Sequence, residues 1–137
     1  MSRNILLWGL ILALLSVALG AFGAHGLKAI VSPEKVTLFE TGVRYQFMHA
    51  LALILLALYV KLYFPTLDPL PVLKWTARLF LLGILFFSGS LYLLSLQALC
   101  SYNYSYIIGP ITPLGGLCFM LGWISWVRVV WSNKVDK

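Results

Sequence analysis

The chain has 137 residues, of which 61% are hydrophobic and 10% are charged, and it carries a formal net charge of +6. So few polar side chains cannot cover the surface of a water-soluble domain, and we therefore expect the chain to lie in a lipid bilayer. The ten Lys and Arg residues are scattered between apolar runs and do not form a patch with stacking aromatic residues, which argues against nucleic acid as a partner.

Four apolar runs, each bounded by charged residues or proline, are long enough to cross a membrane as helices. They cover about residues 5–23, 45–63, 75–99 and 113–131. The first is longer than the core of a cleavable secretion signal, so we interpret it as a membrane helix. Because a lipid-exposed backbone must satisfy its own hydrogen bonds, the sequence predicts an all-α protein, a four-transmembrane-helix bundle formed by a single domain over residues 1–137.

Two positions combine a hydroxyl side chain with a following proline, a pattern typical of helix starts. Ser32 precedes Pro33, and Thr112 precedes Pro113. Each hydroxyl is predicted to cap a helix N-terminus, where proline lacks an N–H that would need a partner. The second helix is therefore expected to begin before its membrane core, with a short interfacial helical stretch over residues 33–44 that leads into it.

The distribution of basic residues predicts the orientation, because cytoplasmic loops carry an excess of Lys and Arg. Seven basic residues fall on the side of the N-terminus and three on the opposite side; they are Arg3, Lys61, Lys74, Arg78, Arg128, Lys134 and Lys137 against Lys28, Lys35 and Arg44. We therefore predict that the N-terminus and the C-terminus are both cytoplasmic. The expected location is a bacterial cell (inner) membrane, which the chain crosses several times.

Most of the informative polar residues gather toward the non-cytoplasmic side of this topology. The candidate polar pocket consists of His25, Glu40, Arg44, Gln46, His49, Gln97 and Thr112. His49 is the ionisable residue that lies clearly within a span, where such residues usually face the bundle interior and mark functional sites. One interpretation is a pocket for a ligand, a metal or a proton. The other is structural: hydrogen bonds between helices, and an interfacial ion pair of Glu40 with Arg44.

The sequence predicts no cofactor, no metal and no enzymatic activity. His25 and His49 have similar predicted depths, but no carboxylate joins them at the spacing of metal ligands. No nucleophile with its base, glycine-rich phosphate loop or carboxylate pair is present. Cys100 and Cys118 match no metal-binding spacing, and whether they are paired stays open.

Small residues recur at helical spacing and are predicted to pack helices together. Close approach of backbones matters in lipid, because no hydrophobic effect draws membrane helices together. The predicted packing positions are Ser16, Gly20, Gly23, Gly89, Gly115 and Gly122.

Four segments in order along the chain resemble one family. They are residues 20–28 (GAFGAHGLK), 40–53 (ETGVRYQFMHALAL), 87–96 (FSGSLYLLSL) and 109–123 (GPITPLGGLCFMLGW). Together they resemble the transmembrane-protein-256-like family, also called domain-of-unknown-function family 423, of small bacterial inner-membrane and mitochondrial proteins. The resemblance implies a four-helix membrane protein and no particular reaction or ligand. Its recurrent positions here are Gly23, His25, Thr41, Gly42, Tyr45, Gln46, His49, Ser88, Gly89, Ser90, Thr112, Pro113, Gly115 and Gly116.

Two functions are compatible with these features. The first is a non-enzymatic membrane protein that acts through helix–helix, partner or lipid contacts, as an accessory or assembly subunit. The alternative is a protein that binds or transports a small ligand or ion in the polar pocket. The expected partners are membrane lipids, with a second copy of the chain or another membrane protein left open.

Overall fold

The computed structural model describes residues 2–65, 71–99 and 103–132, and these residues are almost entirely helical, with no β-strand among them. In chain order the elements are α1 (Ser2–His25), η1 (Leu27–Ala29), α2 (Pro33–Tyr63), α3 (Pro71–Gly83), η2 (Ile84–Ser88), α4 (Gly89–Leu96), η3 (Gln97–Leu99), α5 (Ser105–Ile108) and α6 (Ile111–Ser132). Cys100, whose pairing with Cys118 the sequence leaves open, lies outside the described residues.

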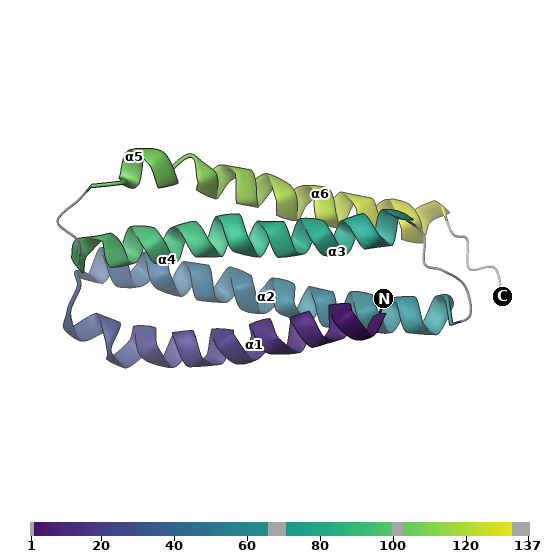
Figure 1. The fold of residues 1–137 in the computed structure, drawn as a ribbon, viewed down its shortest axis with the longest axis horizontal. Coiled ribbons are helices and arrows are strands. Elements are labelled where there is room, and N and C mark those ends of the chain that lie inside the picture. Colours follow the sequence, from purple (N-terminus) through teal and green to yellow (C-terminus); the bar gives the residue numbers. More distant parts are fainter. Residues whose placement is uncertain (1, 66–70, 100–102, 133–137) are drawn as a thin grey trace.

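Four helical stretches are long and apolar enough to cross a membrane: Ser2–Ala29, Pro33–Tyr63, Pro71–Leu96 and Ser105–Ser132. The predicted all-α bundle of four spanning helices is therefore confirmed. In Figure 1 the long helices run side by side, with α1 next to α2 and α3 next to α6, and the start of α1 lies at the same end of the bundle as the end of α6. Contacts of α2 with α4 and η2 join the two helix pairs.

Neither of the two hydroxyl groups predicted to cap a helix does so in the structure. Ser32 is the N-cap of α2 and Pro33 its first residue, but the Ser32 hydroxyl makes no capping hydrogen bond. The backbone carbonyl of Ser32 accepts the first bonds of the helix instead. Thr112 is not a cap, because α6 already begins at Ile111. The physical reason is its position inside the helix, where its hydroxyl lies 2.7 Å from that of Ser90 on α4.

The third span is interrupted by one π-helical segment, η2, between α3 and α4. A π-helix has i→i+5 hydrogen bonds and occurs mostly as a single turn within an α-helix. Ser88 closes this segment and is fully buried, and its hydroxyl has no hydrogen-bond partner among the described residues. A serine in a regular helix usually bonds to a carbonyl one turn earlier, and the altered ladder of η2 coincides with the loss of that bond.

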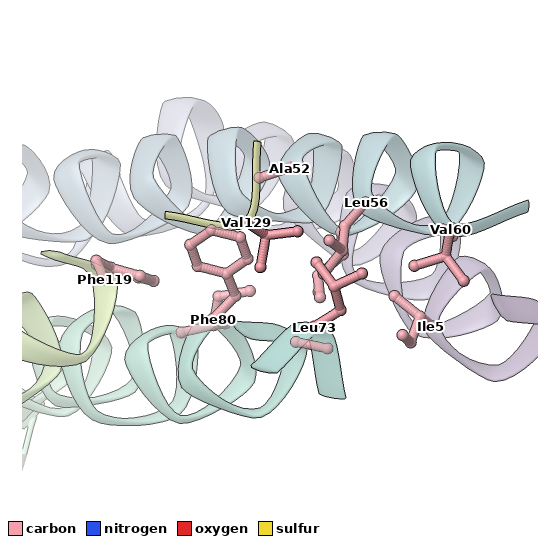
Figure 2. Close-up of a cluster of buried hydrophobic side chains, with 12 residues drawn as sticks. Ile5, Ala52, Leu56, Val60, Leu73, Phe80, Phe119 and Val129 are labelled. Atoms are coloured by element: carbon pink, nitrogen blue, oxygen red, sulfur yellow. The ribbon is translucent and has the colours of Figure 1, made fainter. Parts of the chain in front are cut away.

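The hydrophobic core lies toward the end of the bundle that holds the start of α1 and the end of α6. Figure 2 shows Leu56 of α2 close to Leu73 of α3, Val60 of α2 close to Ile5 of α1, and Phe80 of α3 beside Val129 of α6. Every α2 residue of this cluster follows His49 in the sequence. The bundle therefore has an apolar half, and most buried polar side chains lie in the other half.

Close packing of helices depends on glycine at two contacts in particular. A Cβ atom on Gly115 would overlap the backbone nitrogen of Phe87, so α6 and η2 approach each other at backbone distance. A Cβ atom on Gly42 would lie 2.8 Å from the ring of Tyr92 and 3.2 Å from the carbonyl of Ser88. By contrast, a Cβ atom on Gly89 would have no neighbour within 4 Å, so no close contact requires glycine there.

Candidate functional site

His49 lies between α2 and α6, and both of its ring nitrogens take part in hydrogen bonds. The residue is only 4% exposed. Nδ1 lies 2.8 Å from the carbonyl oxygen of Tyr45, which can only accept, so Nδ1 carries the proton. Nε2 then accepts a hydrogen bond from the indole Nε1–H of Trp123 at 3.2 Å. The imidazole is therefore neutral, and the lone pair on Nε2 is occupied by the hydrogen bond from Trp123.

Aromatic rings surround the imidazole of His49. The ring of Phe119 is stacked on it, with centroids 3.5 Å apart and an interplanar angle of 13°. Tyr45 is stacked at 6.2 Å, and Phe80 is tilted at 5.5 Å. These rings come from α2, α3 and α6, so the histidine joins three helices by packing as well as by hydrogen bonds.

Gln46 is the centre of a second network, between α1, α2 and α4. Its side-chain Nε2 donates to the backbone carbonyl of Leu12 at 3.1 Å. Its Oε1 accepts a hydrogen bond from the Tyr92 hydroxyl at 3.0 Å. The same Leu12 carbonyl accepts the hydroxyl of Ser16 at 2.8 Å. Gln46 is 4% exposed, and both ends of its amide therefore have partners inside the protein.

Two hydroxyl pairs and one lysine link other helices. Ser90 of α4 and Thr112 of α6 lie 2.7 Å apart, as do Thr76 of α3 and Ser125 of α6. Lys35, near the start of α2, donates to the carbonyl of Leu94 at 2.8 Å. In return, the fully buried Ser95 donates to the carbonyl of Lys35 at 2.7 Å.

Gln97, by contrast, does not reach the interior. Its side-chain Nε2 donates to Asn103 at 2.6 Å, and its Oε1 accepts a hydrogen bond from Ser105. These contacts tie the end of the third span to the segment that precedes α6.

The remaining candidate residues, His25, Glu40 and Arg44, are exposed. No ion pair joins Glu40 to Arg44 within the described part of the chain. Four of the seven predicted pocket residues, Gln46, His49, Gln97 and Thr112, thus make separate contacts, and the other three lie on the surface.

The expectation that His25 and His49 lie at similar depth is wrong. Gly23 packs against Phe39, so the end of α1 lies beside the early part of α2. His49 is ten residues further along α2 than Phe39, which is about 15 Å at 1.5 Å per residue. Among the described residues, no group of three or more His, Cys, Asp or Glu side chains could hold a metal ion.

Several residues of these networks were not singled out from the sequence as site residues. Tyr92, Trp123 and Phe119 belong to apolar runs, and their role depends on which helix faces which. The sequence offers one signal for Tyr92 and Trp123: each has a hydrogen-bond donor inside a span, and such a donor usually finds a partner within the protein. The packing glycines Gly9 and Gly83 were also missed, although a Cβ atom on either would contact a neighbouring helix.

Four hydrophobic spans joined by buried interhelical hydrogen bonds define a multi-pass helical membrane protein. The chain belongs to the family described as "Protein of unknown function (DUF423)", whose profile matches residues 19–116. The family resemblance noted from its motifs is therefore confirmed, and so is the bacterial cell (inner) membrane as the location, since relatives are named as membrane or inner membrane proteins.

The bacterial relatives align over most of their length. The UPF0382 membrane protein YwdK of Bacillus subtilis is 40% identical over 116 residues, which are 85% of this chain and 86% of the relative. A UPF0382 membrane protein of Haemophilus influenzae is 42% identical over 109 residues, 80% of this chain and 78% of the relative. The UPF0382 inner membrane protein YgdD of Escherichia coli is 34% identical over 126 residues, 89% of this chain and 85% of the relative. No solved structure matches the chain significantly.

Proposed function

We propose that this protein is a non-enzymatic membrane component that acts through contacts of its helices with lipid, with a partner protein or with another copy of itself, as an accessory or assembly subunit. The observation that carries the proposal is the state of His49. A metal-binding or proton-accepting histidine needs an available lone pair, and the only lone pair of this imidazole faces the indole N–H of Trp123. His49 therefore acts in the α2–α6 contact.

The outer faces of the bundle supply the surface for such contacts. In the most apolar part of the first and fourth spans only 17% of the residues are buried, against 44% in the second span. Large apolar side chains such as Leu14 of α1 and Val127 of α6 are exposed there. In a bilayer these faces contact lipid or the helices of a neighbour.

Native mass spectrometry of the chain extracted in mild detergent tests the proposal, because it reports bound mass and copy number together. We expect a monomer or oligomer that carries lipid alone or a protein partner. His49→Leu is compared with the control Met48→Leu, because Met48 is adjacent in the sequence but its side chain is exposed. A discrete non-lipid adduct that is present in the wild type and in Met48→Leu, but absent in His49→Leu, would overturn the proposal.

A second function, binding or transport of a small ligand or ion, is favoured by Ser88. Its buried hydroxyl has no partner among the described residues, and such a group is satisfied when a ligand or water reaches it. Under this alternative, Ser88→Ala removes the adduct that native mass spectrometry would detect in the wild type. Under the leading proposal, Ser88→Ala changes no bound mass.

A further inference from the structure

One exposed face of the third span combines an aromatic ring, a cation and a row of apolar side chains. Trp75, Arg78, Leu82 and Leu85 recur at steps of three and four residues, so they share one side of this helix. Trp75 is 56% exposed, Leu85 is 63% exposed, and Arg78 and Leu82 are exposed as well. These four side chains therefore point away from the core of the bundle.

Arg78 is held in a defined place on this face. Its guanidinium carbon lies 5.0 Å from the centroid of the Trp75 ring, within the range of a cation–π contact. Arg78 is the eighth residue of α3, which places its backbone about 10 Å along the helix from the first residue. A cation on an apolar span extends to the headgroup region or binds an anion there.

The charges on this side of the predicted topology match an anionic partner, because the sequence places seven basic residues there against two acidic ones, Asp68 and Asp136. Among the described residues no carboxylate forms an ion pair with Arg78, and the two described acidic residues, Glu34 and Glu40, lie at the other end of α2. The other described basic residues at this end are Arg3, Lys61, Lys74 and Arg128.

We propose that this face binds one anionic phospholipid, with its phosphodiester on Arg78 and an acyl chain along Leu82 and Leu85. A guanidinium presents paired N–H donors that suit phosphate oxygens, and tryptophan prefers the headgroup level of a bilayer. The apolar row continues from the cation toward the middle of the span, so the site matches a lipid and not a free phosphate ion. The inference rests on the proposed function, because it names the lipid in one of the proposed contacts.

The test is lipid retention in native mass spectrometry after reconstitution in bilayers of equal phosphatidylglycerol and phosphatidylethanolamine. We expect the wild type to retain phosphatidylglycerol preferentially. Arg78→Gln should lower this retention about fivefold, which corresponds to roughly 1 kcal/mol for one basic residue at an anionic surface. Arg44→Gln, at the other end of the bundle, and Arg128→Gln, at the same end on α6, remove the same charge and should leave retention near the wild-type level.

Two results would overturn the lipid site. One is equal retention of the two lipids by the wild type; the other is an equal loss of phosphatidylglycerol in Arg78→Gln and Arg128→Gln, which would indicate diffuse surface charge. Retained phosphatidylethanolamine is the internal reference, because a variant that fails to fold would lose both lipids. The proposed function is contradicted by a different observation in the same spectra, namely a bound non-lipid mass that is lost in His49→Leu. The two proposals can therefore fail independently.

Discussion

Trp123 donates its indole N–H to Nε2 of His49 across the contact between α2 and α6, at 3.2 Å. The other ring nitrogen of His49 donates to the carbonyl of Tyr45, in the preceding turn of its own helix. One face of the imidazole is stacked on Phe119. A single buried side chain thus joins two helices by a polar bond and an aromatic contact, while Trp123 itself remains partly exposed on the outside of the bundle.

The bond between Trp123 and His49 should contribute measurable coupling to stability. We expect the double-mutant cycle of His49→Phe and Trp123→Phe to give a coupling energy of about 0.6 kcal/mol, with an upper range near 1.7 kcal/mol, as for other hydrogen bonds between membrane helices. The measurement is the free energy of unfolding in mixed micelles, followed by circular dichroism. Trp131→Phe, at a position that is 86% exposed, is the control. Zero coupling would contradict the bond.

The tautomer of His49 can be observed directly. Because Nδ1 faces a carbonyl and Nε2 faces an N–H donor, we expect the neutral ring to carry its proton on Nδ1. Nitrogen NMR of protein labelled at histidine distinguishes the two ring positions, and His25→Gln removes the second histidine signal. In Trp123→Phe the resonance of the unprotonated nitrogen should shift, since its donor is gone. A proton on Nε2 in the wild type would be incompatible with the Trp123 bond.

Two glycines of the predicted packing set should differ sharply in their tolerance of a methyl group. Gly115→Ala places a Cβ atom against the backbone of Phe87, so α6 must move away from η2. We expect a loss of about 1–3 kcal/mol in the free energy of unfolding. Gly89→Ala meets no atom within 4 Å and should be neutral or stabilising by up to about 1 kcal/mol, because alanine favours helix. Equal effects of the two substitutions would contradict the described contact between α6 and η2.

The four spans could be predicted because each depends on local composition: about twenty apolar residues in succession form a helix in lipid whatever their neighbours are. The arrangement of side chains between the spans could not be predicted in the same way. His25 and His49 are an example. The spans predicted from the sequence place them at similar depths, whereas the packing of Gly23 on Phe39 shows that they are far apart along the bundle. Helix registers depend on contacts between distant segments, and these leave no periodic pattern.

The polar residues illustrate the same limit. Gly42, Gln46 and His49 share one face of a predicted helix, and all three are buried. Their partners Tyr92 and Trp123, however, are set by the rotation of two other helices. The π-helical turn before Gly89 has no sequence signature that we could use, although it changes the rotation of every residue after it by a fraction of a turn.

The hydroxyl of Tyr92 should stabilise the contact of α4 with α2 through Gln46. Tyr92→Phe leaves Oε1 of Gln46 buried without its donor, so we expect a loss of about 1 kcal/mol in the free energy of unfolding. In a Gln46→Leu background the same substitution should cost less, because no unsatisfied amide oxygen remains. Tyr63→Phe, at an exposed position, is the matched control. An equal loss in both backgrounds would indicate that the hydroxyl of Tyr92 acts through another group.

The predicted orientation places both termini in the cytoplasm. It depends on the seven basic residues on the side of the termini against three on the other side. Under this orientation Cys100 belongs to the non-cytoplasmic side, so a membrane-impermeant maleimide added to intact cells should label it in a Cys118→Ala variant. A single cysteine introduced as Ser2→Cys, in a background without Cys100 and Cys118, should react only in inside-out vesicles. Labelling of Ser2→Cys in intact cells, with Cys100 protected there, would show that the protein is inserted with its termini outside, and the excess of basic residues would then lie on the outer side.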